Sequence, residues 1–204
     1  MQVLQSVLPE HVKLEIFEDF KAEQSEKYLT WVRKAIRLPL GVMNPCKTNN
    51  VSLQRNILRA SELLDETTTG HSGIKREVLK ILCQSTQCGT TYALGLEGPP
   101  GCKKTHFVKH SLAPALQLPC VSIPLGGVTD ASFLVGCPYS YEGSKEGRLA
   151  AALIEVGCCN PIIHFDEVDK IPKTERGYEI ESVLMDLIDP SEPTWSDVNF
   201  CRFC

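Results

Sequence analysis

Residues 98–105 read Gly-Pro-Pro-Gly-Cys-Lys-Lys-Thr, and this segment constrains the fold more than any other part of the chain. It matches, at all but one position, the pattern G-x-x-x-x-G-K-[ST] of a loop that cradles phosphate groups. Such a loop connects a strand to a helix, and its backbone N–H groups converge on the phosphates where the helix begins. The exception is Lys103, which stands where the pattern has its second glycine.

A second motif follows downstream. The segment Ile162–Phe165 is mostly apolar, and Asp166 and Glu167 come directly after it. This order is typical of a strand that ends at the ligand-binding edge of an open α/β sheet. His164 lies inside the strand, where we expect it to be packed and hydrogen-bonded rather than a ligand. Together the two motifs predict a site for a nucleoside triphosphate.

The residue types in the two motifs give each candidate a role. We expect Lys104 to pair with the outer phosphates, and Thr105 and Asp166 to bind Mg²⁺. Glu167 is the candidate catalytic residue, because its carboxylate can orient or activate the attacking water. The candidate nucleotide-binding residues are Gly98, Pro99, Pro100, Gly101, Cys102, Lys103, Lys104 and Thr105.

Lys103 weakens the first motif without removing it. A glycine at this position lets the backbone approach the phosphates with no Cβ in the way. Lysine adds bulk, and it costs about 1–2 kcal/mol if the position needs a left-handed conformation. Its positive charge beside an anion offsets part of that cost. The alternative is a Gly-Pro-rich turn with incidental lysines and, later, an ordinary acidic turn. That alternative does not explain why both motifs occur in this order.

The composition excludes several classes of protein. With 204 residues, 43% of them hydrophobic and 23% charged, the chain is expected to bury a core. A net charge of -4 gives no case for a nucleic-acid patch. No apolar run is long enough to span a membrane, and no targeting signal is visible. Ten scattered cysteines favour free thiols, and therefore an intracellular, soluble and most simply cytoplasmic protein. Cys201 and Cys204 have zinc-knuckle spacing, but no matching second pair follows.

The pattern along the chain changes from helical to alternating. The first part is predicted to be helical, because apolar residues recur at helical spacing over 12–20, 28–36 and 51–65, and a helix starting at Ser72 follows. Strands are then predicted at Tyr92–Leu96, Pro119–Leu125 and Pro161–Asp166. Helices are predicted near Lys104, over Lys145–Val156 and over Arg176–Ile188, with Thr129 or Asp130 capping a shorter one. Pro114 should disturb the helix that starts near Lys104. This alternation predicts a parallel α/β sheet with crossover helices.

With these residues described, the chain resembles the ATPase module of Lon proteases, a branch of the AAA+ family. The resemblance runs from about Ser25 to about Phe200. The segments that carry it, besides the two motifs, are Leu38-Pro39-Leu40, Gly73-Ile74-Lys75, Leu125-Gly126-Gly127-Val128-Thr129-Asp130, Gly147-Arg148, Asp169-Lys170 and Leu187-Ile188-Asp189-Pro190. Finer details at Phe133-Leu134 and Ser140–Ser144 look more like the Lon-type ATPases of large DNA viruses.

The resemblance implies a fold and a set of partners. It implies a P-loop NTPase fold, the AAA+ large subdomain with an incomplete parallel sheet, preceded by a helical segment. We place a neck-like helical segment at 1–66 and the ATPase core at 67–204. The implied ligands are ATP and Mg²⁺, and the implied assembly is a ring of identical subunits. Tyr141 would lie on a pore loop that grips unfolded polypeptide.

Several parts of a Lon protease are expected to lie beyond Cys204. These are the sensor asparagine, the arginine finger, the helical lid and the Ser-Lys protease domain, so peptidase activity is not expected of this segment. Residues 197–200 match the polar stretch that follows Asp-Pro in the family. Alternatively, Ser196–Phe203 forms the next strand of the sheet.

Three functions remain open from the sequence. The first is an ATPase module of a longer machine that couples ATP binding and hydrolysis to protein unfolding. The second is a nucleotide-binding pseudoenzyme without turnover, which Lys103 and the missing arginine favour. The third is an interaction module that binds a partner through its N-terminal helices.

Overall fold

The sheet at the centre of the molecule has two parallel strands. A computed structural model describes residues 10, 13, 14, 16, 26–44, 50–85, 93–137, 146–188, 195–197 and 201–203. Strand β1 (Cys120–Pro124) pairs with β2 (Ile162–Asp166), and Ile123 lies opposite Phe165. The predicted α/β class with an incomplete parallel sheet is confirmed.

Three helices pack on this sheet and form the main core. They are α7 (Ser132–Val135), α8 (Arg148–Val156) and α9 (Glu175–Ile188). Their buried side chains meet those of the strands in one cluster that includes Ile123, Leu134, Leu149 and Ile180. Helix α8 ends where Gly157 takes a left-handed conformation with φ 75°, which a residue without a Cβ adopts most easily.

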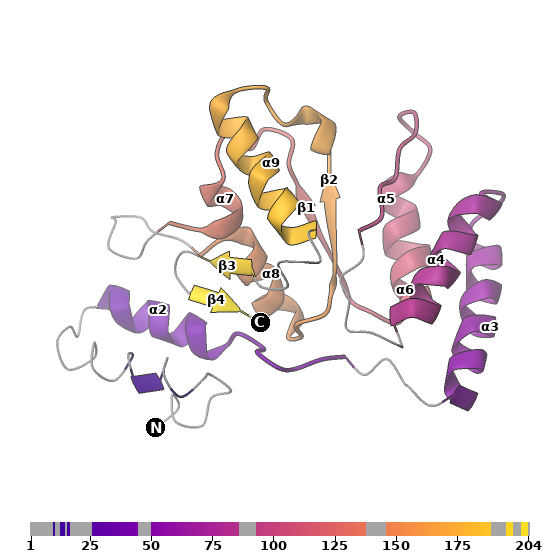
Figure 1. Ribbon diagram of the computed structural model, residues 1–204, viewed down its shortest axis with the longest axis horizontal. Coiled ribbons are helices and arrows are strands. Elements are labelled where there is room, and N and C mark those ends of the chain that lie inside the picture. The colour runs from indigo at the N-terminus through magenta and orange to yellow at the C-terminus, as the bar shows by residue number, and fades with distance from the viewer. Residues whose placement is uncertain are drawn as a thin grey trace.

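A second core lies beyond the other edge of β2, among five helical segments (Figure 1). They are α3 (Asn50–Thr67), α4 (Ser72–Ser85), α5 (Lys104–Phe107), the π-helical turn η1 (Val108–Leu112) and α6 (Ala113–Leu116). Leu64, Val78, Phe107 and Leu112 are buried there, and Leu94 and Leu96 pack against them. This core fixes the position of α5, because Phe107 of that helix is buried in it.

Pro114 explains why a π-helical turn interrupts the helix that follows the loop at residues 98–103. Proline has no N–H, and in an α-helix its ring clashes with the carbonyl four residues earlier. The chain instead widens over η1, so that the N–H of Ala113 donates to the carbonyl of Val108 five residues back. The predicted disturbance is therefore confirmed, and it takes the form of a π-turn rather than a break.

The strand predicted at Tyr92–Leu96 is wrong for its described part. Residues 93–99 run as irregular chain and pair with neither β1 nor β2. A strand is held by the hydrogen-bond ladder to a neighbour, and apolar content alone supplies none. Leu94 and Leu96 bury their side chains against helices instead.

Two further predictions need correction. Helix α8 begins at Arg148, and the described residues 146–147 precede it as irregular chain. The alternative of one parallel strand over Ser196–Phe203 is also wrong, because β3 (Trp195–Asp197) and β4 (Cys201–Phe203) pair with each other as an antiparallel ribbon. Pairing between close segments costs less loop-closure entropy than joining a distant sheet.

The N-terminal helix α2 (Glu26–Ile36) docks on the ATPase-like part of the chain. The Tyr28 hydroxyl donates to the carbonyl of Ile16 at 2.9 Å, and Trp31 stacks beside Tyr28. Ala35 and Leu38 share a small core with Ala150 of α8. The division into 1–66 and 67–204 stays a prediction, and across it α3 packs directly on α4. Among the described helices, none is long and apolar enough to cross a membrane.

Candidate functional site

The loop over residues 98–103 projects beyond the start of α5, at the same end of the molecule as the carboxyl end of β2 (Figure 1). Gly101 has φ 82°, a conformation that glycine adopts without steric cost. Residues 98–103 are exposed, and Lys104 and Thr105 are half-buried. The loop thus presents its backbone to solvent where a helix begins, which is the general arrangement of anion sites in proteins.

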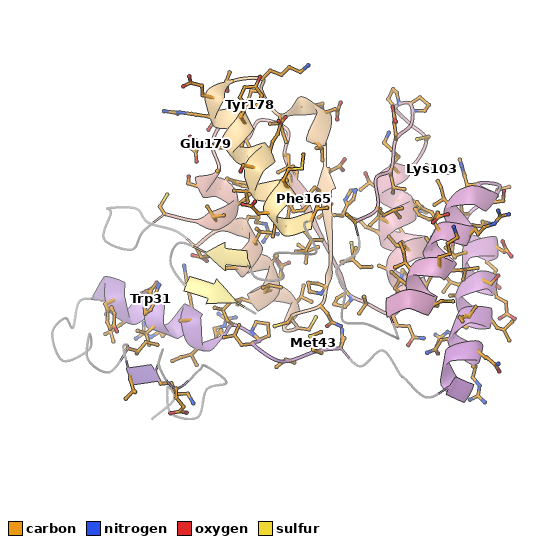
Figure 2. The ribbon with its side chains drawn as sticks, viewed as in Figure 1. Trp31, Met43, Lys103, Phe165, Tyr178 and Glu179 are labelled. Carbon is orange, nitrogen blue, oxygen red and sulfur yellow. The ribbon has the colours of Figure 1, made fainter. Side chains whose placement is uncertain are left out.

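Lys103 occupies the glycine position of the pattern in a left-handed conformation, with φ 59° and ψ 32°. Its carbonyl accepts the first helical hydrogen bond of α5, from the N–H of Phe107 at 2.9 Å. The residue therefore acts as the N-terminal boundary of α5 (Figure 2). Because a β-carbon crowds the backbone in this conformation, the lysine carries strain of about 1–2 kcal/mol that a glycine would not.

Lys104 turns its side chain back into the loop. Its Nζ donates to the carbonyl of Gly98 at 2.7 Å and to that of Pro99 at 3.2 Å. The Cys102 sulfur lies 3.8 Å from the same nitrogen. The ammonium group is therefore held at the centre of the predicted phosphate-binding segment, and the loop's own carbonyls are its acceptors.

Thr105 and Asp166 come together from the two motifs. The Thr105 hydroxyl, in the first turn of α5, donates to Oδ2 of Asp166 at 3.0 Å. Oδ1 of Asp166 accepts from the backbone N–H of Glu167 at 3.0 Å. Both side chains are half-buried, so the pair forms a cluster of oxygen atoms at the carboxyl end of β2.

Glu167 has an unusual backbone conformation, with φ 60° in the left-handed region. It precedes the short 3₁₀ turn η2 (Val168–Lys170), and its carboxylate forms an ion pair with Lys170. The hydrogen bond and negative charge of Glu167 raise the pKa of the Lys170 ammonium. A β-carbon built on Gly126 would lie 2.0 Å from Oε2 of Glu167, so the absence of a side chain at 126 leaves room for this carboxylate.

Lys170 and Gly126 were not among the predicted site residues. The signal for Lys170 was present, because a lysine three residues after a glutamate can pair with it across one helical turn. Gly126 left no such signal, since only the packing of Glu167 shows why a glycine is useful there. Strained backbone at a candidate catalytic residue is the kind of feature that gathers at active sites.

His164 is hydrogen-bonded within the sheet, as predicted. Its Nδ1 lies 2.9 Å from the Ser122 hydroxyl on the neighbouring strand. Burial lowers the pKa of His164, Asp166 opposes this, and Lys109 adds to the lowering. The ring is therefore a neutral packing group near the site rather than a member of it.

Tyr141 falls outside the described residues. Within the part of the chain that is described, no group of three or more His, Cys, Asp or Glu residues gathers as a metal site. Among the described cysteines, Cys102, Cys120, Cys137, Cys158 and Cys159 carry free thiols.

Comparison with known proteins shows the family of the chain. The model of the family AAA, "ATPase family associated with various cellular activities", matches residues 94–202. A Lon protease homolog of Acanthamoeba polyphaga mimivirus is 32% identical over 70% of this chain and 14% of its own length. The mitochondrial Lon protease homolog of Drosophila melanogaster is 32% identical over 94% of this chain and 18% of its own.

A third relative, the mitochondrial Lon protease homolog 3 of Arabidopsis thaliana, is 31% identical over 93% of this chain and 20% of its own length. The chain therefore spans a fifth or less of these three relatives. A viral and a cellular homolog share the same identity, so the finer viral resemblance stays a prediction. The comparisons favour an ATPase module over a nucleotide-binding pseudoenzyme. The chain belongs to the AAA family of ATPases, as a module that resembles the one in Lon proteases.

Proposed function

We propose that this module binds ATP together with Mg²⁺ at residues 98–105 and Asp166. The observation that carries the proposal is the 3.0 Å hydrogen bond between the Thr105 hydroxyl and the Asp166 carboxylate. It joins residues 61 positions apart into one site. A motif that occurred by chance would have no reason to meet the acidic end of β2 in space.

The loop supplies the binding of phosphate. Its backbone N–H groups and the start of α5 favour an anion. The Lys104 ammonium already lies within the loop, held by weak neutral acceptors at Gly98 and Pro99. A phosphate oxygen is a stronger, charged acceptor, so Lys104 can exchange these carbonyls for it with little movement of its side chain.

The oxygen atoms of Thr105 and Asp166 suit Mg²⁺. A hydroxyl and a carboxylate are hard ligands, which this ion prefers, and two protein ligands leave room for phosphate oxygens and water. When bound, Mg²⁺ and ATP supply the transferable phosphoryl group and neutralise its charge. The role of Asp166 is to hold the ion, and that of Thr105 is to fix its position at the start of α5.

Glu167 is our candidate for orienting the attacking water. It lies next to Asp166, and its carboxylate lies beside Gly126 and pairs with Lys170. A carboxylate there can accept a proton from a water that attacks the phosphate. The ion pair with Lys170 holds this carboxylate in place.

The wider role is also a proposal. The relatives are named Lon protease homologs, and this chain spans a small part of them. We propose that the module forms part of a ring of subunits that couples ATP hydrolysis to the unfolding of polypeptides, with Tyr141 at the pore. We place it inside the cell, in the cytoplasm, a location supported by the free thiols.

Calorimetric titration with a non-hydrolysable ATP analogue and Mg²⁺ tests the binding site. Wild-type protein should bind, and Lys104→Ala should lose at least about tenfold in affinity, as expected for a lost charge-assisted hydrogen bond. Lys109→Ala, which removes the same charge further along the same helical segment, should bind like wild type. Equal binding by Lys104→Ala and wild type would show that the nucleotide binds elsewhere.

A further inference from the structure

We propose that His106 and His110 form a binding site for a divalent transition-metal ion such as Zn²⁺ or Ni²⁺. The two rings contact each other at a tilt on the helical segment that follows residues 98–103. Their centroids are 4.4 Å apart and their planes are inclined by 34°. Both residues are exposed, so an ion can reach them from solvent.

The spacing of the rings suits chelation. Two imidazole nitrogens that share one ion lie about 2.0–2.1 Å from it. Since the centre of each ring lies roughly 1 Å behind its nitrogen, the centroids of two chelating rings are about 4.5–5 Å apart at angles between square-planar and tetrahedral. The observed 4.4 Å reaches that range with a small rotation of either side chain. Histidines four apart on one helix face are a known ligand pair for zinc.

The ligand chemistry selects the class of metal. Imidazole binds Zn²⁺, Cu²⁺ and Ni²⁺ well, whereas Mg²⁺ prefers oxygen. The pair is therefore chemically distinct from the oxygen cluster at Thr105 and Asp166, although His106 directly follows Thr105. Since no third His, Cys, Asp or Glu joins the pair in the described regions, water or an external ligand would complete the coordination.

The place of the pair in the helix gives the ion a structural effect. His106 belongs to the first turn of α5 and His110 to the π-turn η1, so a shared ion would link the two turns. The next residue, Ser111, is buried and lies 2.9 Å from the Thr68 hydroxyl. A bound metal ion would therefore link α5, which carries Thr105, to η1, where Ser111 is hydrogen-bonded to Thr68.

Titration of the chain with NiCl₂, in buffer without nucleotide or Mg²⁺, tests the proposal. The variants are His106→Gln, His110→Gln and the double variant, and His71→Gln is the matched control with an exposed histidine outside the pair. Each single variant should weaken Ni²⁺ binding by about tenfold or more, because losing either ligand abolishes chelation. The double variant should be no worse than the singles, and His71→Gln and excess MgCl₂ should have no effect.

The non-additive pattern separates chelation from other modes of Ni²⁺ binding, including binding by cysteines. Losses that simply add between the two singles, or no loss in either, would overturn the proposal, as would an equal loss in His71→Gln. Far-UV circular dichroism in EDTA should be the same for all variants, because both rings are on the surface. Since no nucleotide is present, a failure of ATP binding would leave this result intact.

Discussion

The Thr105 hydroxyl lies 3.0 Å from Oδ2 of Asp166, and this contact ties the first turn of α5 to the carboxyl end of β2. It brings a neutral donor to a charged acceptor at a half-buried place, where such a bond contributes more than at the surface. Thr105 precedes β1 in the sequence and Asp166 follows it, so the fold, rather than the local sequence, brings the two residues together.

Thr105→Val should remove most of the Mg²⁺ dependence of nucleotide binding. Valine has the shape of threonine but no hydroxyl to contact the ion or Asp166. The ratio of the affinities for an ATP analogue with and without Mg²⁺ should be about tenfold smaller in Thr105→Val than in wild type, in keeping with one lost bond to a charged group. Calorimetry with and without Mg²⁺ gives this difference. Thr105→Ser, which keeps the hydroxyl, should behave like wild type, and the same Mg²⁺ dependence in valine and serine variants would refute the role.

The sequence motifs predicted correctly that Asp166 ends a strand at this site, but they did not predict correctly which other segments form strands. Asp166 was correctly placed at the end of a strand, because an apolar run followed by two acidic residues is a strong local signal. The adjacent strand at 92–96 was wrong, because its pairing depends on a neighbour that local sequence does not specify. Leu94 and Leu96 are as apolar as strand residues, yet they pack on helices.

Other features follow only from three-dimensional packing. The left-handed backbone of Glu167 and its carboxylate over Gly126 depend on the path of two separate loops. The strain at Lys103, by contrast, could be predicted from the sequence, on the condition that this position is left-handed, because the pattern calls for glycine there. The left-handed φ of 59° now meets that condition. The assignment of the site residues themselves stays a prediction that nucleotide titrations of the variants test.

Gly177→Ala should destabilise the protein. A β-carbon at this position in α9 would lie 1.7 Å from the carbonyl oxygen of Pro172, a backbone atom that cannot move aside alone. We expect the free energy of unfolding to fall by about 2 kcal/mol or more, as for other overpacked sites. Urea unfolding is the measurement. Gly177 is buried, whereas the neighbouring Tyr178, labelled in Figure 2, is exposed, so the effect belongs to the buried side of the helix.

Gly73→Ala is the matched control, because this glycine also lies in the first turn of a helix. Nothing lies within 4 Å of a β-carbon built there. Alanine should stabilise α4 by up to about 1 kcal/mol, since it loses less backbone freedom than glycine on folding. If the two substitutions had the same effect, the contact between Gly177 and Pro172 would not be a packing constraint.

Asp130 should contribute a pH-dependent part of the stability. The hydroxyl of Ser132 and then its backbone N–H donate to the Asp130 carboxylate, the latter at 2.8 Å, and they lower the pKa of Asp130 below 3.8. A lowered pKa in the folded state means that the stabilisation is complete above 3.8 and is lost as the pH falls through the folded value. The carboxylate holds the start of α7.

Asp130→Asn should therefore be less stable than wild type at pH 6, and the two should converge as the pH falls through the lowered pKa of Asp130. Urea midpoints at several pH values give the comparison, and the difference between the curves cancels the other carboxylates. Glu175→Gln serves as a control, because Glu175 is exposed in the first turn of a different helix, α9. A gap between Asp130→Asn and wild type that does not narrow as the pH falls below 3.8 would mean that shape, rather than charge, matters at this residue.

Lys103→Gly should increase both the stability of the chain and its affinity for an ATP analogue. Glycine adopts the left-handed conformation of this position freely, so we expect a gain of about 1 kcal/mol against urea. The affinity should rise because the loop backbone can approach phosphate without a β-carbon. Calorimetry and urea unfolding on the same preparations measure the two effects.

Two controls separate strain from charge. Lys103→Ala removes the ammonium but keeps a β-carbon at φ 59°, so it should gain no stability and should lose some affinity through the missing charge. Gln117→Gly relieves the same left-handed strain at φ 56° away from the loop, so it should gain stability with no change in affinity. If Lys103→Gly binds the nucleotide more weakly than wild type, the lysine is a phosphate contact whose charge outweighs its strain. In that case the left-handed backbone would be the means by which this loop brings a second lysine to the nucleotide.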